Sequence, residues 1–200
     1  MTCADQDLTI KQGKTFSKVI RWESAPLVYK AITAITKAGP VAVTAATHGL
    51  PDGWRAAIVS TTGMRQINSK NWPLRDADFH KITKVDANSF TVNDINSTEY
   101  DTYTSGGYVV YYTPVDLTGY TARMKIRDTV GGTLLTTLTT ENSGIALDNT
   151  LKTITLTITA TDTAALTWLS GVYDLELVSS GGVVTELLHG AVTVIPEITT

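Results

Sequence analysis

The chain has 200 residues, enough for one large or two small domains, and a formal net charge of -3 with only 18% charged residues. It lacks the basic surplus that neutralises phosphates, so nucleic acid is not an expected partner. No apolar run approaches the ~20 residues that span a bilayer, and the first residues lack the basic and apolar regions of a signal peptide. We therefore expect a protein without a membrane span, made in the cytoplasm of the producing cell and kept there until something releases it.

The N-terminal segment predicts two short strands. Residues 7–10 and 16–22 are expected to form them, separated by a turn at residues 11–14. Two strands cannot bury an apolar face alone. The face of the second strand that carries Trp22 therefore needs other strands to cover it.

Residues 32–110 differ in composition from the flanking segments and predict a second, small β unit. This segment is rich in aromatic residues and in turn-forming clusters. Residues 68–78 have no clear periodicity and are expected to form a loop. Strands are expected at four places, with a tight turn over residues 86–88 between the last two: residues 41–44, 56–60, 81–85 and 89–92.

Alternation of apolar and polar residues is clearest in the C-terminal half. In residues 153–159 it places Ile154, Leu156 and Ile158 on one face and threonines on the other, which predicts a half-buried strand. Further strands are expected at residues 121–127 and 173–177, and shorter ones at 134–138, 183–188 and 191–195.

Turn-forming residues separate these strands at intervals typical of an antiparallel sandwich. The Gly-Gly pairs at residues 106–107 and 131–132 are expected to be hairpin turns, and residues 179–182 to join two apolar runs in a further hairpin. Only residues 161–166 favour a helix, of one or two turns, led by a Thr or Asp cap. The pattern as a whole predicts an all-β protein.

Six stretches of the outer segments occur in an order that is informative, although no single stretch is specific. The first covers residues 10–16, and the second, residues 115–120, leads into a strand that ends at Ile126 and Arg127. The others follow in the order residues 163–166, 171–175, 190–194 and 196–199. In this order the outer segments resemble the N-terminal domain of upper-baseplate and related phage tail proteins.

Four stretches of the middle segment carry a second resemblance: residues 48–50, 63–68, 82–90 and 100–107. With these stretches the segment is similar to a repeat of phage tail proteins that is related to the first catalytic-cysteine half-domain of ubiquitin-activating enzymes. The segment contains no cysteine, so the resemblance implies a building module without enzyme activity. It departs from the repeat at residues 71–78, where Trp72 to Arg75 lengthen or reshape a loop.

Together the two resemblances imply that one domain interrupts the other. In the tail domain the strand ending near Trp22 is soon followed by the strand entered at residues 116–119, but about ninety residues intervene here. We therefore expect an all-β fold in which residues 1–30 and 112–200 form a discontinuous, immunoglobulin-like antiparallel β-sandwich that mediates assembly. Residues 31–111 would form an inserted, small β-barrel-like domain, because exposed sandwich loops tolerate insertions. Pro26 and Pro114 would mark the junctions.

No residue pattern indicates catalysis, and we expect a protein that is not an enzyme and holds no cofactor or metal. The histidines, His48, His80 and His189, lack metal-ligand spacing, and His48 in a turn is expected to be packed or capping. Cys3, the single cysteine, has no nearby general base and is expected to be inert. Neither a G-x-S-x-G nor a phosphate-binding G-x-x-x-x-G-K-[ST] motif is present.

Loop carboxylates are the alternative to this view. Asp76 and Asp78 with Asp86, or Glu99 with Asp101, have the residue types needed for glycoside hydrolysis or for calcium. Loop acids are usually only solvated, and the sequence cannot reveal a paired geometry. We therefore expect no hydrolase or calcium site.

Aromatic residues of the middle segment are the candidate partner-binding residues. Trp54, Trp72, Tyr100 and Tyr103 would form either a core or an exposed patch that stacks on sugars or anchors a partner. Trp72 lies next to Pro73 in the unpatterned loop and is expected to be exposed. Core positions are expected for Trp22 and Phe90.

The resemblance implies a virion protein, a structural component of the tail tip or baseplate of a siphophage. It would be a collar or ring subunit that assembles with copies of itself and contacts other tail or fibre proteins. Uncharged threonine faces suit subunit contacts, and a ring needs head-to-tail contacts that close by rotation. The main alternative is a module that binds a host-surface glycan or receptor through the inserted domain. An enzyme that degrades surface polysaccharide is the least supported hypothesis.

Overall fold

The structure is a computed structural model that describes residues 4–198, and nearly all of its regular elements are β-strands. The predicted all-β fold is confirmed, with antiparallel sheets as the main elements. The expectation for Cys3 falls outside the described residues.

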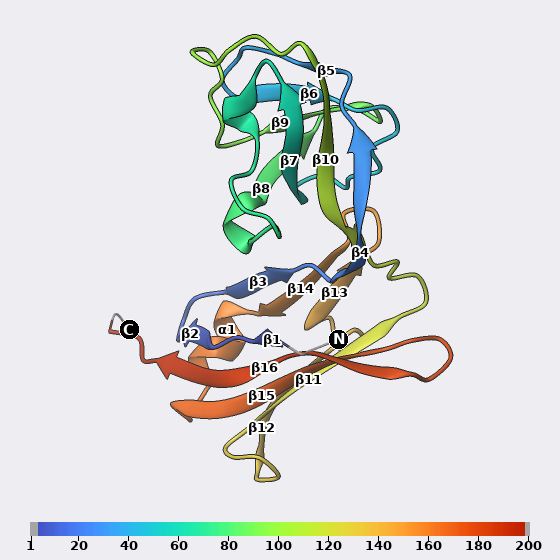
Figure 1. Ribbon diagram of the computed structural model, residues 1–200. Coiled ribbons are helices and arrows are strands. Elements are labelled where there is room, and N and C mark those ends of the chain that lie inside the picture. Colours follow the sequence, from blue (N-terminus) through green and yellow to red (C-terminus); the bar gives the residue numbers. More distant parts are fainter. Residues whose placement is uncertain (1–3, 199–200) are drawn as a thin grey trace. The chain divides into compact units, whose positions relative to one another are not determined.

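The chain divides into two compact units, coloured along the sequence in Figure 1. The outer unit comprises Met1–Trp22 and Asp116–Thr200, and the inserted unit is the continuous segment Glu23–Val115. These boundaries enlarge the inserted unit relative to the expected residues 31–111, because β4 (Glu23–Ala31) pairs along its length with β10 (Ser105–Pro114). Pro26 and Pro114 lie within this strand pair, as the fourth and the second-last residue of the inserted unit, so they are close to the junctions.

Two sheets build the outer unit. The six-stranded sheet has the order β1-β16-β15-β11-β12, with β2 also paired to β16, and the three-stranded sheet has the order β13-β14-β3. Figure 1 shows the smaller sheet lying over one face of the larger one. The strands are β1 (Ala4–Asp5), β2 (Leu8–Lys11), β3 (Phe16–Ile20), β11 (Thr121–Arg127), β12 (Leu134–Thr139), β13 (Ile145–Asp148), β14 (Thr153–Ile158), β15 (Ser170–Val178) and β16 (Val184–Ile195).

Alternation along these strands buries the faces that the sequence predicts. Ile154, Leu156 and Ile158 of β14 are buried, as are Ala122, Met124 and Ile126 of β11 and the inward residues of β15. The two N-terminal strands join different sheets, because β2 pairs with β16 and β3 pairs with β14. Trp22, just after β3, is therefore covered and only 8% exposed, as predicted.

The C-terminal strand is longer than predicted. Two short strands were expected at residues 183–188 and 191–195, but they form one strand, β16. At Gly190, in its middle, an added Cβ would lie 2.5 Å from the backbone oxygen of Gln6. Glycine therefore lets the segment between β1 and β2 approach β16 closely as it runs alongside. The predicted hairpin at residues 179–182 and a single-turn helix, α1 (Ala160–Ala164), are both present.

The inserted unit is one seven-stranded sheet of order β4-β10-β7-β8-β9-β6-β5. β4 and β5 lie at opposite edges, yet only Ile32 and Thr33 separate them in the chain. A flat sheet would hold these edges roughly 29 Å apart, but so short a linker spans at most about 10 Å. The sheet must therefore curl around one core. Its other strands are β5 (Ala34–Ile35), β6 (Val41–Thr44), β7 (Arg55–Thr62), β8 (His80–Lys84) and β9 (Ser89–Val92).

Two features of the inserted unit differ from the prediction. The sequence pattern predicts no strand at β4, β5 or β10. Gly106 and Gly107 lie inside β10 and do not form a hairpin turn. Both have positive φ, and a Cβ on Gly107 would lie 2.6 Å from Cγ2 of Thr61 on the neighbouring β7. The glycines therefore allow two paired strands to approach closely.

Candidate functional site

Three of the four candidate aromatic residues contribute to the core of the inserted unit. Trp54 is completely buried among apolar side chains, and its Nε1 donates to the backbone oxygen of Tyr112 at 3.2 Å. Tyr100 and Tyr103 are partly buried against the same core, and the Tyr103 hydroxyl lies 2.9 Å from the backbone oxygen of Gly106. The prediction of a binding surface is wrong for Trp54, because the curled sheet encloses it. Tyr100 and Tyr103 are mainly packing residues.

Trp72 differs from the other three because its side chain is 74% exposed. It lies in the loop between η1 (Arg65–Ile67) and the short 3-10 helix η2 (Asp76–Asp78), where the absence of periodicity predicted a loop. Tryptophan is over-represented among the residues that carry binding energy at interfaces, so this exposed Trp72 is a candidate for contact with a partner. Partner binding by Trp72 stays a prediction.

The start of this loop is fixed by Asn68. Its side-chain oxygen accepts from the backbone N–H of Thr61 at 2.8 Å, and its amide donates to the backbone oxygen of Thr61 at 3.2 Å. The Asn68 side chain thus makes the two backbone hydrogen bonds with β7 that a neighbouring strand would make. Next to it, the N–H of Ser69 donates to the backbone oxygen of Ile58 at 2.7 Å. The loop therefore leaves the sheet in a defined direction.

The end of the loop is organised around Asp78, which is only 6% exposed. Its carboxylate accepts from the backbone N–H of Arg75 at 2.8 Å and from the amide of Asn71 at 3.1 Å. These bonds, the one from Arg75 above all, lower the pKa of Asp78. Between the two fixed ends, Trp72 is held outward. We call residues 68–78 the Trp72 loop.

Arg55 adds a further restraint next to this loop. Its guanidinium bonds both oxygens of Glu23 at 2.7 Å and one oxygen of Asp76 at 2.9 Å, and it lies 5.4 Å from the ring centre of Phe79. Hydrogen bonds to Glu23 raise the pKa of Arg55. The bidentate pair joins β7 to the first residue of the inserted unit.

Four of the five carboxylates weighed as hydrolase or calcium residues have structural partners; Glu99 is exposed. Asp76 bonds Arg55, and Asp78 bonds its own loop. Asp86 accepts from the N–H of Asn88 at 2.7 Å in the tight β8–β9 turn, and Asp101 accepts from Gln66 at 2.9 Å. No group of three or more His, Cys, Asp or Glu side chains within residues 4–198 is placed to hold a metal ion.

His48 is a packed histidine, as predicted. It is completely buried, its Nδ1 accepts from the N–H of Leu50 at 3.0 Å, and its Nε2 lies 3.1 Å from the backbone oxygen of Asp86. This arrangement requires the neutral ring with the proton on Nε2. Burial lowers the pKa of His48, which favours the same form.

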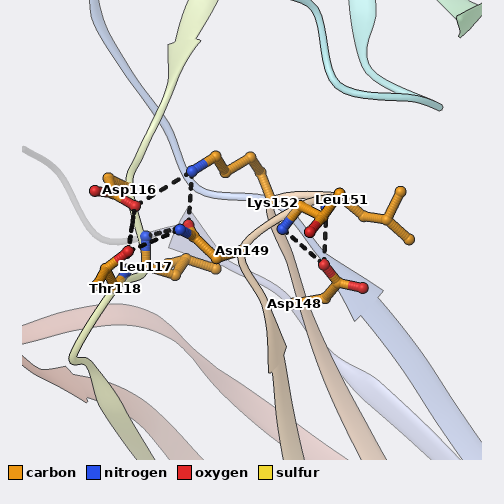
Figure 2. A network of polar contacts seen from close by, with 8 residues as sticks. Asp116, Leu117, Thr118, Asp148, Asn149, Leu151 and Lys152 are labelled. Carbon is orange, nitrogen blue, oxygen red and sulfur yellow. Dashed lines mark hydrogen bonds and ion pairs between the residues drawn. The ribbon is translucent and has the colours of Figure 1, made fainter.

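A polar network fixes the turn where the chain re-enters the outer unit. Figure 2 shows Asn149 at its centre. The side-chain oxygen of Asn149 accepts from the N–H of Leu117 at 2.8 Å and from Nζ of Lys152 at 2.6 Å, and its amide donates to Thr118 at 2.8 Å. Asp116 bonds Thr118 and Lys152. Hydrogen bonds from Asn149, Thr118 and Lys152 lower the pKa of Asp116 to about 2.

The outer face of the six-stranded sheet carries two rows of opposite charge. Arg123, Lys125 and Arg127 alternate with buried residues on β11, so they point away from the core. Asp174 and Glu176 do the same on β15. The register places Arg123 opposite Glu176, where Nε and Oε2 are 2.6 Å apart, and Lys125 opposite Asp174.

Glu186 and His189 of β16 extend this face, with His189 Nδ1 and Glu186 Oε1 2.9 Å apart. The hairpin between β11 and β12 borders it, and Val130 near the hairpin tip is 92% exposed. Sheet and hairpin together form a groove of about 710 Å³. We name the charged face by its residues: Arg123, Lys125, Arg127, Asp174, Glu176, Glu186 and His189.

In the described part of the chain, no helix has the length and apolar character needed to cross a membrane. The sequence matches no protein-family model. It also shows no significant similarity to a curated protein.

Proposed function

We propose that this protein is a non-enzymatic structural subunit of a phage tail tip or baseplate. In the proposal the outer unit, as an immunoglobulin-like sandwich, forms a collar or ring with copies of itself. The inserted unit contacts neighbouring tail or fibre proteins. The site of action would be the virion.

Ordered sequence motifs and the division of the chain support this proposal. The stretches that resemble a tail domain all lie in the outer unit, except Val115 at the start of one, and those that resemble the tail-protein repeat all lie in the inserted unit. The observation that carries most weight is that the inserted unit is one continuous segment closed by its own strand pair, β4 and β10. Such an insertion can change its contacts without altering the sandwich that hosts it.

The direct test is to locate the protein in particles. Phage induced from the strain that carries the gene would be purified and analysed by mass spectrometry and by immunogold labelling with an antibody to this chain. The proposal expects the protein in purified particles and gold at the tail end distal to the head. Its absence from intact particles, or labelling confined to the head, would rule out the tail role.

The alternative of host-surface recognition is favoured by the Trp72 loop. An exposed tryptophan on a loop fixed at both ends presents a flat apolar face without a large ordering cost, which suits stacking on a sugar or insertion into a protein pocket. Whole-cell binding and a glycan array with purified protein test this alternative. Binding abolished by Trp72→Ala and retained by Val85→Ala, an exposed apolar residue elsewhere in the same unit, would favour recognition over assembly.

A further inference from the structure

We propose that the charged face is a self-association surface, on which two copies of the chain meet across a twofold axis parallel to the strands. The inference rests on the proposed self-assembly and adds a second kind of contact to it: a ring needs head-to-tail contacts, whereas this twofold contact joins two copies in a closed pair. It is nevertheless tested in solution, independently of any particle.

The charge pattern is complementary to itself. The basic row of β11 and the acidic row of β15 run side by side on neighbouring strands. A twofold rotation about an axis between these strands exchanges the rows, so each basic row faces the acidic row of the second copy. The rotation leaves position along the strands unchanged. Lys125 would thus face Asp174 of the second copy, and Arg123 would face Glu176.

Lys125 and Asp174 are the residues that would gain most from an opposite charge on a second copy. Both are exposed and opposite one another in the register. Within residues 4–198, however, neither takes part in an ion pair, whereas Arg123 bonds Glu176 and His189 bonds Glu186. A second copy brings each of them an opposite charge, and the symmetry makes the contact twice.

The groove can be filled by the same rotation. β12 lies beyond β11 and β16 lies beyond β15 in the sheet order. Because the rotation exchanges β11 and β15, the β11–β12 hairpin of one copy lies over the β16 side of the other. The exposed side chain of Val130 then meets the groove that Gly190 helps to line. A highly exposed valine would thereby be partly covered by the second copy.

Association along the β12 edge, the competing way to extend this sheet, is obstructed by Asn142. The N–H of Thr140 donates to Ala122 on β11, so the backbone groups of Thr139 and Thr137 point away from β11. Asn142 accepts from the outward N–H of Thr139 at 2.8 Å and donates to the outward oxygen of Thr137 at 3.0 Å. A side chain thus occupies the positions that an added strand would use. The face remains open.

The expected dimer is weak and salt-sensitive. Four strands and about five residues along each give a footprint of roughly 19 by 17 Å, which is small beside the ~800 Å² per partner of a stable complex. Charge pairs at an exposed surface weaken with salt. Copies held in a particle would meet at a much higher effective concentration than free ones.

Sedimentation velocity of the full chain tests this surface, at up to several hundred micromolar protein in about 25 mM and about 500 mM salt. Wild type is expected to dimerise in low salt and to dissociate in high salt. Lys125→Glu or Asp174→Lys alone should weaken dimerisation by about tenfold, since each places like charges opposite one another twice. The double variant K125E/D174K should restore it to within about threefold of wild type. Lys37→Glu, which makes the same charge change off this face, should have no effect.

Circular dichroism would confirm that each variant is folded. If a charge-reversal variant does not fold, the neutral variants Lys125→Gln and Asp174→Asn would replace it. Three results would overturn the proposal. Wild type could stay monomeric in low salt, which would leave the face to another occupant. The single reversals could dimerise as well as wild type, or the double variant could remain dissociated.

Discussion

The outer and inserted units bury their cores in different ways. In the outer unit, alternating strand residues such as Met124, Leu156 and Leu175 supply most of the core. In the inserted unit, Leu50, Trp54, Met64 and Ile67 are all buried although none of them lies in a strand. Sequence periodicity therefore predicts the core of the outer unit well and that of the inserted unit poorly. A loop can place a large side chain in the interior without any strand pattern.

The largest expected effect comes from removing a core residue of one unit. Trp54→Ala should destabilise the inserted unit by about 3–5 kcal/mol, because truncation of a buried aromatic leaves a cavity. Hydrogen exchange of the full chain would show faster exchange in β6, β7 and β9, with β11 and β14 still protected. Leu156→Ala should give the opposite pattern. Equal loss of protection in both units after either change would contradict their separation.

A smaller effect is expected at the polar network of the outer unit. Asn149→Ala leaves the N–H of Leu117 without its side-chain acceptor and should cost about 1 kcal/mol. Urea unfolding would measure the loss. Asn88→Ala, at a turn of the inserted unit, is a matched control that should leave the outer unit unchanged. Wild-type stability of the outer unit in Asn149→Ala would show that the network does not hold the re-entry turn.

Acid should weaken the same network. The pKa of folded Asp116 is about 2, below its ordinary value of 3.8. A lowered carboxyl pKa stabilises the fold above the ordinary value, and the contribution is lost as the pH falls through the folded value. Outer-unit stability should thus fall between about pH 4 and pH 2. The stability of the outer unit in Asp116→Asn, measured from unfolding curves, should depend less on pH in this window. An unchanged pH dependence would show that Asp116 does not cause the effect.

A subtler effect is expected at the β12 edge. Asn142→Ala frees the N–H of Thr139 and the backbone oxygen of Thr137, so the amide of Thr139 should exchange faster. The variant should also self-associate in a manner that salt does not reverse, because strand addition uses backbone hydrogen bonds. Unchanged exchange at Thr139 would mean that Asn142 does not cap the edge.

Trp72→Ala should have the smallest effect on the folded chain. An exposed side chain away from caps and buried polar groups contributes within about 0.5 kcal/mol. Thermal unfolding should therefore match wild type. A clear loss of stability would mean that Trp72 packs within the fold and does not serve as a contact residue.

Much of the fold can be predicted from the sequence where one strand face is buried. β11, β14 and β15 follow from alternation alone. β4 could not be predicted, because none of its residues is fully buried and it therefore has no apolar period. The apolar run of β10 is likewise not alternating, since Val109, Val110 and Tyr111 are all buried.

The candidate sites show the same limit. The lack of periodicity in residues 68–78 was enough to expect an exposed Trp72. The charged face could not be predicted from the sequence, although alternation already placed Arg123 and Lys125 outward. It exists only because β11 pairs with β15, a contact about fifty residues apart in the chain. Local periodicity does not show which strands, distant in the chain, pair with one another.

A cryo-electron microscopy map of the tail of particles that contain this chain would locate both units in the assembly. We expect the sandwich of the outer unit to form the wall of a ring or collar and the inserted unit to contact a different protein. A map in which the inserted unit forms the ring wall, or in which the chain lies on the head, would contradict this expectation.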